Sequence, residues 1–203
     1  MQAQVVALRD VTPTVREFEL RPEPGFAATY EPGSHLQVQV MTTQGKLQTR
    51  SYSLVGEGDG QCWRIAVKRL DDGRGGSLAM WRLAVGDRLQ VSAPQNHFLL
   101  DTSAPGYLLV AGGIGITPLV LMAERLGEHA RRTGVPVKML YGARYAGEFA
   151  YLDRLREALG DEVAAHEGAA PIDFASAIAT LPPGGQLYTC GPVPMLEAVK
   201  RAW

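Results

Sequence analysis

Cysteine is scarce in this chain of 203 residues: it has only Cys62 and Cys190, which lie far apart in the sequence. Two distant cysteines cannot form a disulfide framework or hold an iron–sulfur cluster unaided. The four histidines lack metal-ligand spacing, so we predict no metal site. No apolar run approaches the ~20 residues that span a bilayer, and Met1–Gln4 does not begin a secretory signal. We therefore expect a cytoplasmic protein that does not associate with membranes.

An excess of charge of either sign is also missing. Twenty Lys and Arg residues face 21 Asp and Glu residues, which gives a net charge of -1. Such a chain has no overall basic field to attract nucleic acid, so nucleic acid is not an expected partner. The composition is ordinary for a globular protein, and the length suits one large domain or two small ones.

The first half of the chain reads as short strands separated by turns such as Pro22–Gly25 and Glu31–Gly33. Six strands are predicted, at Val5–Leu8, Val15–Leu20, His35–Val40, Arg50–Val55, Trp63–Arg69 and Leu89–Ser92. Their hairpin-length spacing favours a six-stranded antiparallel barrel, which removes exposed sheet edges.

The second half alternates strands and helices, which indicates a parallel α/β sheet with helices on its faces. Strands are predicted at Tyr107–Ala111, Val137–Tyr141, Val163–His166 and Gln186–Thr189, and helices at Leu119–Leu126, Tyr151–Leu159, Phe174–Thr180 and Pro194–Ala202. The polar stretch Asp101–Gly106 separates the two halves. We therefore predict domains at about 1–103 and 104–203.

The segment Arg50-Ser51-Tyr52-Ser53-Leu54 combines a cation, an aromatic ring and two hydroxyls on one strand. Alternation puts Arg50, Tyr52 and Leu54 on one face and the two serines on the other. A strand of this kind can bind a planar, charged ligand. It can equally be an amphipathic barrel strand with an exposed arginine, and the segment alone does not decide.

A second segment, Gly73-Arg74-Gly75-Gly76-Ser77, precedes a predicted helical turn at Leu78–Trp81. Glycines let backbone N–H groups approach an anion, and a helix start favours negative charge. Ser77 can cap the turn or donate its hydroxyl to a phosphate, and Arg50 supplies a planar cationic fork. The alternative is a flexible glycine-rich loop.

The third segment, Gly112-Gly113-Ile114-Gly115-Ile116-Thr117-Pro118, follows a predicted strand and begins a helix, the context of a dinucleotide-binding turn. It is not the G-x-G-x-x-G pattern, because Pro118 stands at the third glycine position. Proline suits the first residue of a helix, and a pyrophosphate would sit over this terminus. A tight turn without a ligand remains the alternative.

Two further segments follow strands of the predicted parallel sheet. Cys190-Gly191-Pro192 comes after one strand and therefore lies at a carboxyl end, where open α/β sheets bind ligands. A buried core cysteine is the alternative. Arg144 follows another strand and could meet an adenosine ribose or a 2′-phosphate, or be a solvated surface residue. Glu148 nearby favours NADH over NADPH.

In this order and at these spacings, Arg50–Leu54, Gly112–Pro118 and Cys190–Pro192 resemble the ferredoxin–NADP reductase superfamily, flavoproteins that accept hydride from NAD(P)H. The stretch Ala66-Val67-Lys68-Arg69 through Gly73–Ser77 is similar to the phthalate dioxygenase reductase branch, which includes the vanillate demethylase reductases. That branch uses FMN and passes electrons to an iron–sulfur cluster.

The resemblance implies that the barrel binds flavin and the α/β domain binds NAD(P)H. It implies that Tyr52 packs along the flavin, that Ser53 lies near its reactive nitrogen, and that Arg50 meets its phosphate. Thr117 and Cys190 would lie near the nicotinamide. The expected catalytic residues are Ser53, Thr117 and Cys190, and the expected cofactor-binding residues are Arg50, Ser51, Tyr52, Ser53, Ala66, Val67, Lys68, Gly75, Gly76, Ser77, Gly112, Gly113, Gly115, Thr117, Pro118, Arg144, Cys190, Gly191 and Pro192.

The resemblance further implies electron transfer from NADH (NADPH being possible) through FMN (FAD being less expected) to an iron–sulfur protein, as the reductase component of an oxygenase system. A stand-alone flavin reductase or diaphorase, or a non-catalytic flavin-binding subunit, is the alternative. Members of the branch usually continue into a [2Fe–2S] domain with a Cys-x4-Cys-x2-Cys pattern. These 203 residues lack that pattern, so we expect the cluster on a further segment or on another polypeptide such as a ferredoxin.

Overall fold

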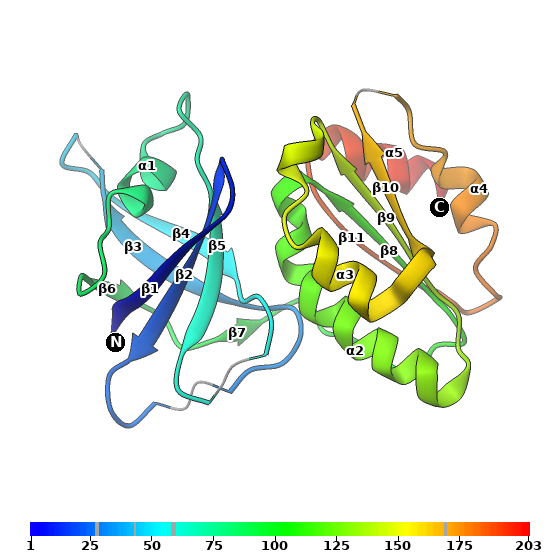
Figure 1. Cartoon of the computed structure of the whole chain (residues 1–203), viewed down its shortest axis with the longest axis horizontal. Helices are drawn as coiled ribbons and strands as arrows, with labels where there is room; N and C mark the ends of the chain where they lie inside the picture. Colours follow the sequence, from blue (N-terminus) through cyan, green and yellow to red (C-terminus); the bar gives the residue numbers. More distant parts are fainter. Residues whose placement is uncertain (27–28, 43, 58–59, 169) are drawn as a thin grey trace. The chain divides into compact units, whose positions relative to one another are not determined.

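The computed structural model describes residues 1–26, 29–42, 44–57, 60–168 and 170–203. The chain divides into two compact units, Met1–Leu99 and Leu100–Trp203 (Figure 1). The first unit is all antiparallel strand with one short helix, and the second is a parallel sheet covered by helices. The predicted fold class is therefore confirmed, while the domain limits at 103 and 104 stay a prediction.

The first unit is one antiparallel sheet of seven strands in the order β4-β3-β6-β1-β2-β5, with β7 paired to β3. The strands are β1 (Gln2–Thr12), β2 (Val15–Pro22), β3 (Ser34–Met41), β4 (Leu47–Ser53), β5 (Trp63–Lys68), β6 (Arg88–Val91) and β7 (Gln95–Asn96). Six of the seven were predicted. The seventh, β7, has only two residues, which is too short to show an alternating pattern.

The sheet curls so that the chain just after β4 is hydrogen-bonded both to β3 and to β5, the strand at the other end of the order. The N–H of Leu54 donates to the carbonyl of Ser34 on β3, at 2.8 Å, and the N–H of Val55 donates to the carbonyl of Arg64 on β5, at 2.9 Å. Leu54 also forms a β-bridge with Ile65. These bonds satisfy backbone groups that an open edge would leave unpaired.

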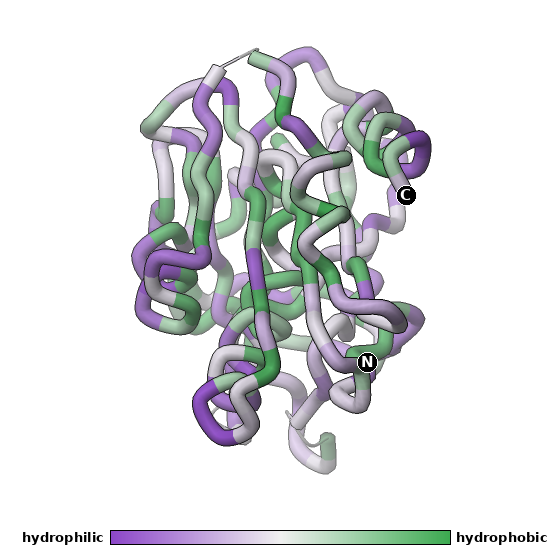
Figure 2. The backbone as a smooth tube through the Cα atoms, turned by 90° about the vertical axis from the view of Figure 1, so that its right-hand side faces the viewer, coloured by the Kyte–Doolittle hydropathy of each residue, from purple (hydrophilic) through white to green (hydrophobic). Residues whose placement is uncertain are grey.

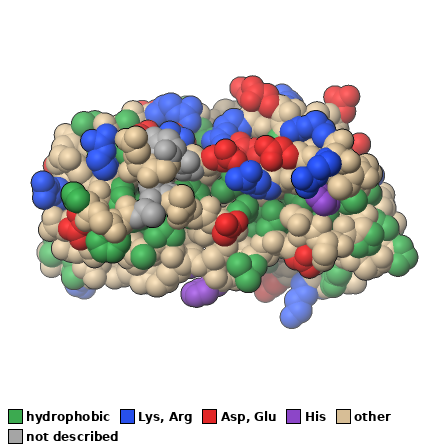
Figure 3. Space-filling model, turned by 90° about the horizontal axis from the view of Figure 1, so that it is seen from below, with side chains coloured by type: hydrophobic (Ala, Val, Ile, Leu, Met, Phe, Trp, Pro, Cys, Tyr) green, Lys and Arg blue, Asp and Glu red, His purple; other side chains and the backbone are tan. Residues whose placement is uncertain are grey.

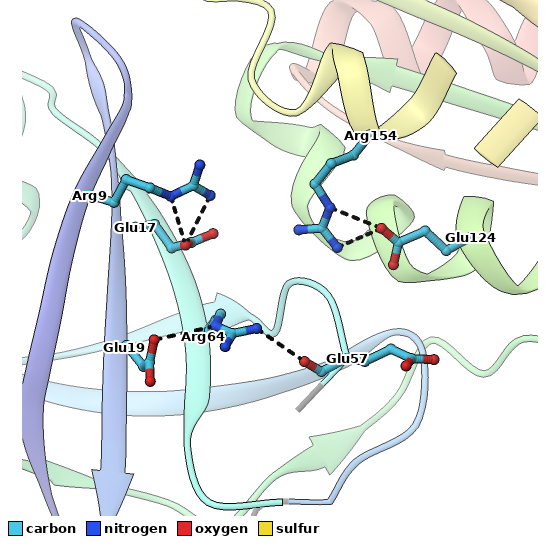
Figure 4. A network of polar contacts seen from close by, with 7 residues as sticks. All are labelled: Arg9, Glu17, Glu19, Glu57, Arg64, Glu124 and Arg154. Atoms are coloured by element: carbon cyan, nitrogen blue, oxygen red, sulfur yellow. Dashed lines mark hydrogen bonds and ion pairs between the residues drawn. The ribbon is translucent and has the colours of Figure 1, made fainter. Parts of the chain in front are cut away.

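Alternation fills the barrel with apolar side chains. On β3, Leu36 and Val38 are fully buried while Gln37 and Gln39 are exposed. Each large side chain buried in this way contributes ~1.5–3 kcal/mol. The outer face carries ion pairs instead, such as Arg9 with Glu17, and Arg64 with Glu19 (Figure 4).

The helix α1 (Gly76–Trp81) is too short to be stable alone and depends on packing. Met80 is fully buried in the barrel core. The indole N–H of Trp81 donates to the carbonyl of Val67 at 3.0 Å, and the guanidinium of Arg16 lies 4.3 Å from its ring centroid. These contacts fix the helix, and the loop before it, against β2 and β5.

The second unit is a four-stranded parallel sheet in the order β10-β9-β8-β11. Its strands are β8 (Tyr107–Gly112), β9 (Val137–Ala143), β10 (Val163–Glu167) and β11 (Gln186–Cys190), and its α-helices are α2 (Thr117–Thr133), α3 (Leu152–Leu159), α4 (Phe174–Ile178) and α5 (Val193–Ala202). Helices α2 and α3 cover one face and α4 and α5 the other (Figure 1). Every residue of β8 is buried, as expected for an inner parallel strand. Figure 2 colours the backbone by hydropathy and shows hydrophobic stretches alternating with hydrophilic ones along the chain.

Helix α2 is longer than predicted. The apolar pattern stops at Leu126, but the helix continues to Thr133 and ends at Gly134, whose φ of 77° is left-handed. Beyond Leu126 packing still contributes: Gly127 is buried, and a Cβ added to it would lie 2.3 Å from the carbonyl oxygen of Ala158 on α3. The left-handed glycine then ends the helix. Glu124 of α2 accepts from both Nε and Nη2 of Arg154 on α3, the first at 3.0 Å (Figure 4).

Basic and acidic side chains are interspersed on the face drawn in Figure 3, in keeping with the net charge of -1. In the part of the chain that the structure describes, no helix is long and apolar enough to cross a membrane.

Candidate functional site

The strand β4 presents the alternation that the sequence predicts. Thr49 and Ser51 are exposed, whereas Tyr52 packs against the barrel core and Leu54 is fully buried. Burial raises the pKa of Tyr52 to about 12, so its hydroxyl stays protonated at neutral pH. Arg50, Tyr52 and Leu54 therefore share the inward-facing side of the strand.

Ser53 lies beside a pair of imidazoles that sequence reasoning did not connect to it. It is the cross-strand partner of His35 on β3, and the ring of His35 lies 5.5 Å from that of His97, centroid to centroid. Burial, followed by the charge of His97, lowers the pKa of His35. The two histidines are far apart in the sequence, and only the pairing of β7 with β3 brings them together.

The predicted phosphate cradle meets Arg50. Gly75 precedes α1 with a left-handed φ of 82°. A Cβ added to Gly76 would lie 3.2 Å from Nε of Arg50 and 3.1 Å from Oε1 of Gln48. Glycine at this position therefore lets the helix start lie directly against the guanidinium, and a backbone with a cation beside it suits a phosphate. The sequence predicted Arg50 and the glycines but gave no signal for Gln48.

The structure contradicts one of the two alternatives for Ser77, the one in which it caps the helical turn. Ser77 does not cap the helix, because α1 begins at Gly76 and Ser77 lies inside its first turn. Its hydroxyl accepts from the N–H of Leu70 at 3.1 Å and contacts the Leu70 carbonyl at 3.4 Å. A role for Ser77 in binding would therefore use its backbone N–H, and stays a prediction.

Three predicted residues lie on β5, next to this region. Val67 is buried in the barrel core, and its carbonyl accepts the indole N–H of Trp81 from α1. Ala66 is buried and Lys68 half-buried. The strand and the cradle helix are thus tied together within the first unit.

In the second unit, β8 ends at Gly112 and a 3-10 turn, Gly113–Ile116, leads into α2. Pro118 is the second residue of the helix and not the first, because Thr117 already has helical backbone angles. The hydroxyl of Thr117 donates to the carbonyl of Ile114 at 3.0 Å, so in this structure it holds the turn.

The segment Cys190–Pro192 packs against this turn. A Cβ on Gly115 would lie 2.2 Å from the carbonyl oxygen of Cys190, and a Cβ on Gly191 would lie 3.0 Å from Cα of Gly112. No larger residue fits at these positions. The two motifs, far apart in the sequence, form one close-packed edge at the carboxyl ends of β8 and β11.

The glycines of the turn fall into two kinds. Gly112, Gly115 and Gly191 are needed for packing, since neighbouring atoms fill the space of a side chain. Gly113 is different, because no described atom lies within 4 Å of its missing Cβ and its φ is 52°. Its carbonyl accepts the hydroxyl of Tyr141 at 3.2 Å. Of these four glycines, Gly113 is the one that leaves room for an approaching ligand.

Cys190 is half-buried and paired in register with Ala111 of β8. Burial raises the pKa of its thiol, so it stays protonated at neutral pH and is a poor nucleophile. A small neutral thiol can pack against a flat ring without reacting.

Arg144 follows β9 and is exposed, and no ion pair among the described residues engages it. The carboxylate of Glu167 on β10 accepts the N–H of Ala146 at 3.0 Å. Glu167 therefore brings a second carboxylate, besides that of Glu148, to this loop. Sequence reasoning missed Glu167, because only the pairing of β10 with β9 brings it here.

Two family models match the chain. The oxidoreductase FAD-binding domain matches residues 2–99, and the oxidoreductase NAD-binding domain matches residues 109–201. The domains of these two models bind a flavin and a nicotinamide nucleotide, respectively.

The chain is 41% identical to the phenoxybenzoate dioxygenase subunit beta of Ectopseudomonas oleovorans, over 91% of this chain and 57% of the relative. It is 34% identical to the phthalate 4,5-dioxygenase oxygenase reductase subunit of Pseudomonas putida, over 97% and 61%. A solved phthalate dioxygenase reductase, described as a modular structure for electron transfer from pyridine nucleotides to [2Fe–2S], superposes with a TM-score of 0.83 and 30% identity, over 100% of this chain and 63% of that one. The chain thus spans less than two thirds of these proteins.

Proposed function

Since the chain belongs to the ferredoxin–NADP reductase superfamily, with an FAD-binding and an NAD-binding oxidoreductase domain, we propose that it takes electrons from NADH through bound FMN and passes them to an iron–sulfur protein. The observation that carries this proposal is the contact of Arg50 with the cradle glycine Gly76. It brings a cation of the strand that resembles a flavin-binding strand against the backbone at the start of α1.

On the flavin side, Arg50 and the N–H groups of Gly76 and Ser77 would hold the phosphate. Tyr52 and Ser53 on β4, with Ala66–Lys68 on β5, would line the ring. One cradle with one arginine supports a monophosphate, FMN, over FAD, although the matching family model is named for FAD. When bound, the flavin would supply the chemistry that side chains lack. It can accept one hydride, which carries two electrons, and release these electrons one at a time.

On the nucleotide side, the work of the protein is orientation. Gly113 would leave room for the nucleotide backbone, while Thr117 and Cys190 would fix the position of the nicotinamide. The neutral thiol of Cys190 offers close packing and no competing nucleophile. Hydride transfer needs no general base, so the proposal asks none of this chain.

The partner follows from the relatives. One of them is named a reductase subunit of phthalate 4,5-dioxygenase, and the solved homologue is described as delivering electrons to [2Fe–2S]. We propose that this chain likewise serves an oxygenase system, through a ferredoxin or a [2Fe–2S] domain.

The test is anaerobic. The purified chain is reconstituted with flavin, the bound flavin is released by denaturation and identified by chromatography, and the holoprotein is mixed with NADH. We expect FMN, and bleaching of its absorption band in a single mixing. Bound FAD would refute the FMN assignment, and a flavin that NADH leaves oxidised would refute the reductase proposal.

A further inference from the structure

Gln48 stands two residues before Arg50 on β4, so both side chains lie on the same face. The amide oxygen of Gln48 accepts from Nη2 of Arg50. Its amide nitrogen donates to the carbonyl of Arg74 at 3.0 Å. One neutral side chain therefore joins the arginine of β4 to the loop that carries Gly75 and Gly76.

The packing at the helix start shows how close this arrangement is. A Cβ on Gly76 would meet Oε1 of Gln48 at 3.1 Å and Nε of Arg50 at 3.2 Å. The amide and the guanidinium thus lie together against the first residue of α1. The loop is supported on another side by Thr42, whose Cβ would lie 3.5 Å from a Cβ on Gly75.

The hydrogen bonds also orient the guanidinium. Nη2 of Arg50 is held by Gln48, and Nη1 donates to the carbonyl of Thr49 at 2.9 Å. A guanidinium carries five N–H donors in a fixed plane. Because two are held by neutral acceptors, the plane is set and the remaining donors keep their full charge for an anion.

We propose that Gln48 is a positioning residue for the FMN phosphate. It holds Arg50 and the Arg74 carbonyl in the geometry that the phosphate needs, and it does so without charge. The amide accepts from Arg50 and donates to a carbonyl while staying neutral. This inference rests on the proposed function, because it concerns the same flavin site.

The charge of the side chain gives the sharpest test. A glutamate at position 48 would form a charge-assisted pair with Arg50 and place a negative charge beside the phosphate. A leucine would keep the size but lose both hydrogen bonds. Riboflavin has the ring and ribityl chain of FMN but no phosphate, so it separates an effect on the phosphate site from an effect on the strand.

The experiment measures dissociation constants of FMN and riboflavin by flavin fluorescence titration, for the full chain and for Gln48→Glu and Gln48→Leu. We expect Gln48→Glu to weaken FMN by at least ~10-fold and Gln48→Leu by about 3- to 10-fold, with riboflavin affinity unchanged within about twofold. The loss in Gln48→Glu should shrink as salt rises. The matched control is Gln39→Glu, which adds the same charge at an exposed position on β3.

Each outcome decides something. If both variants bind FMN as the original chain does, the inference is wrong while the proposed function stands. If FMN and riboflavin weaken equally, Gln48 supports only the strand, and the inference is again wrong. If the unaltered chain binds neither flavin, the proposed function fails first. Should Gln48→Glu fail to fold, Gln48→Leu with the riboflavin comparison decides alone.

Discussion

Arg50 is the residue whose contacts bear most directly on cofactor binding, because its guanidinium lies against Gly76. We expect Arg50→Ala to weaken FMN binding by roughly 1.5–3 kcal/mol, the usual contribution of a charge-assisted hydrogen bond. Riboflavin binding should change little. Fluorescence titration checks this, with Arg88→Ala as the control, since Arg88 is an exposed arginine on β6 of the same unit. An equal loss in the control would point to overall charge and not to the cradle.

A substitution at Gly115 tests whether the edge formed by the carboxyl ends of β8 and β11 is as closely packed as the structure shows. A methyl group there would lie 2.2 Å from the carbonyl oxygen of Cys190, so the backbone must shift. We expect Gly115→Ala to lower the free energy of unfolding by about 1–3 kcal/mol and to weaken NADH binding. Urea denaturation and NADH titration measure the two effects. Gly147→Ala is the control, because no described atom lies within 4 Å of its Cβ, and a comparable loss there would contradict the packing argument.

For single residues, the sequence indicated the candidate site residues more fully than it indicated their contacts. Arg50 and the glycines are visible as residue types with known uses. The partner of Arg50, Gln48, is not, because glutamine at a strand position has no distinctive signal. Likewise, nothing in the sequence separates Gly113, which is open, from Gly115, which is packed. That difference arises only when the turn meets Cys190.

At the scale of the element, β4 carries a titratable side chain toward the barrel core. The pKa of Tyr52 rises from 10.0 to about 12 because burial disfavours the phenolate. The folded state therefore keeps this proton after the unfolded chain has lost it. The associated stability is complete below pH 10 and is lost as the pH rises to 12, an effect of about 2–3 kcal/mol. Urea denaturation from pH 9 to 12 should show a steeper loss for the original chain than for Tyr52→Phe. Identical slopes would mean that Tyr52 ionises freely in the fold.

We expect the charges around the loop after β9 to favour NADH over NADPH. Arg144 is its one cation, whereas Glu148 and Glu167 bring two carboxylates. A 2′-phosphate would be repelled, so we expect a higher kcat/KM with NADH than with NADPH, measured with a dye acceptor. Glu167→Gln should lower the ratio of kcat/KM with NADH to kcat/KM with NADPH. A clear advantage for NADPH in the original chain would show that the 2′-phosphate has other partners.

Element types were predictable because the hydrophobic period changes from two in the barrel to the strand–helix alternation of the second unit. The residues at which elements begin and end were less predictable than the element types. Helix α2 runs on past Leu126 to Gly134, with Gly127 packed against α3, and β7 forms by pairing with Ser34 and His35. Both depend on neighbours or propensity and not on an apolar pattern.

For the whole molecule, the distinction between accepting and delivering electrons matters. Among the described residues no cluster of three or more metal-binding side chains exists, and Cys62 is buried. The sequence has only two cysteines, too few to ligate an iron–sulfur cluster that could act as a one-electron relay. We expect NADH to reduce the bound flavin quickly, while reduction of an oxygenase stays slow until a ferredoxin or [2Fe–2S] domain is added. Stopped-flow absorbance follows both steps. Full oxygenase turnover by the chain alone would contradict the relay argument.

The order of motifs along the chain was enough to predict a flavin-type unit followed by a nucleotide-type unit. It was not enough to predict which motifs touch. Arg50 and Gly76 meet because the barrel curls, and Gly115 and Cys190 meet because β8 and β11 are neighbours in the sheet. Such contacts follow from topology, which the spacing of motifs does not encode.

The hydrogen bonds by which Leu54 and Val55 close the barrel have a thermodynamic consequence. Leu54 and Val55, which fasten β3 to β5, directly follow the segment Arg50–Ser53 that we assign to the flavin. Separating β3 from β5 at this point would therefore also displace the strand that we propose binds the cofactor. A ligand that binds only the closed barrel stabilises it by an amount that grows with the ratio of the free ligand concentration to its Kd. The bound cofactor would thus stabilise the closed barrel, and the barrel without cofactor would be the form most open to local unfolding and proteolysis.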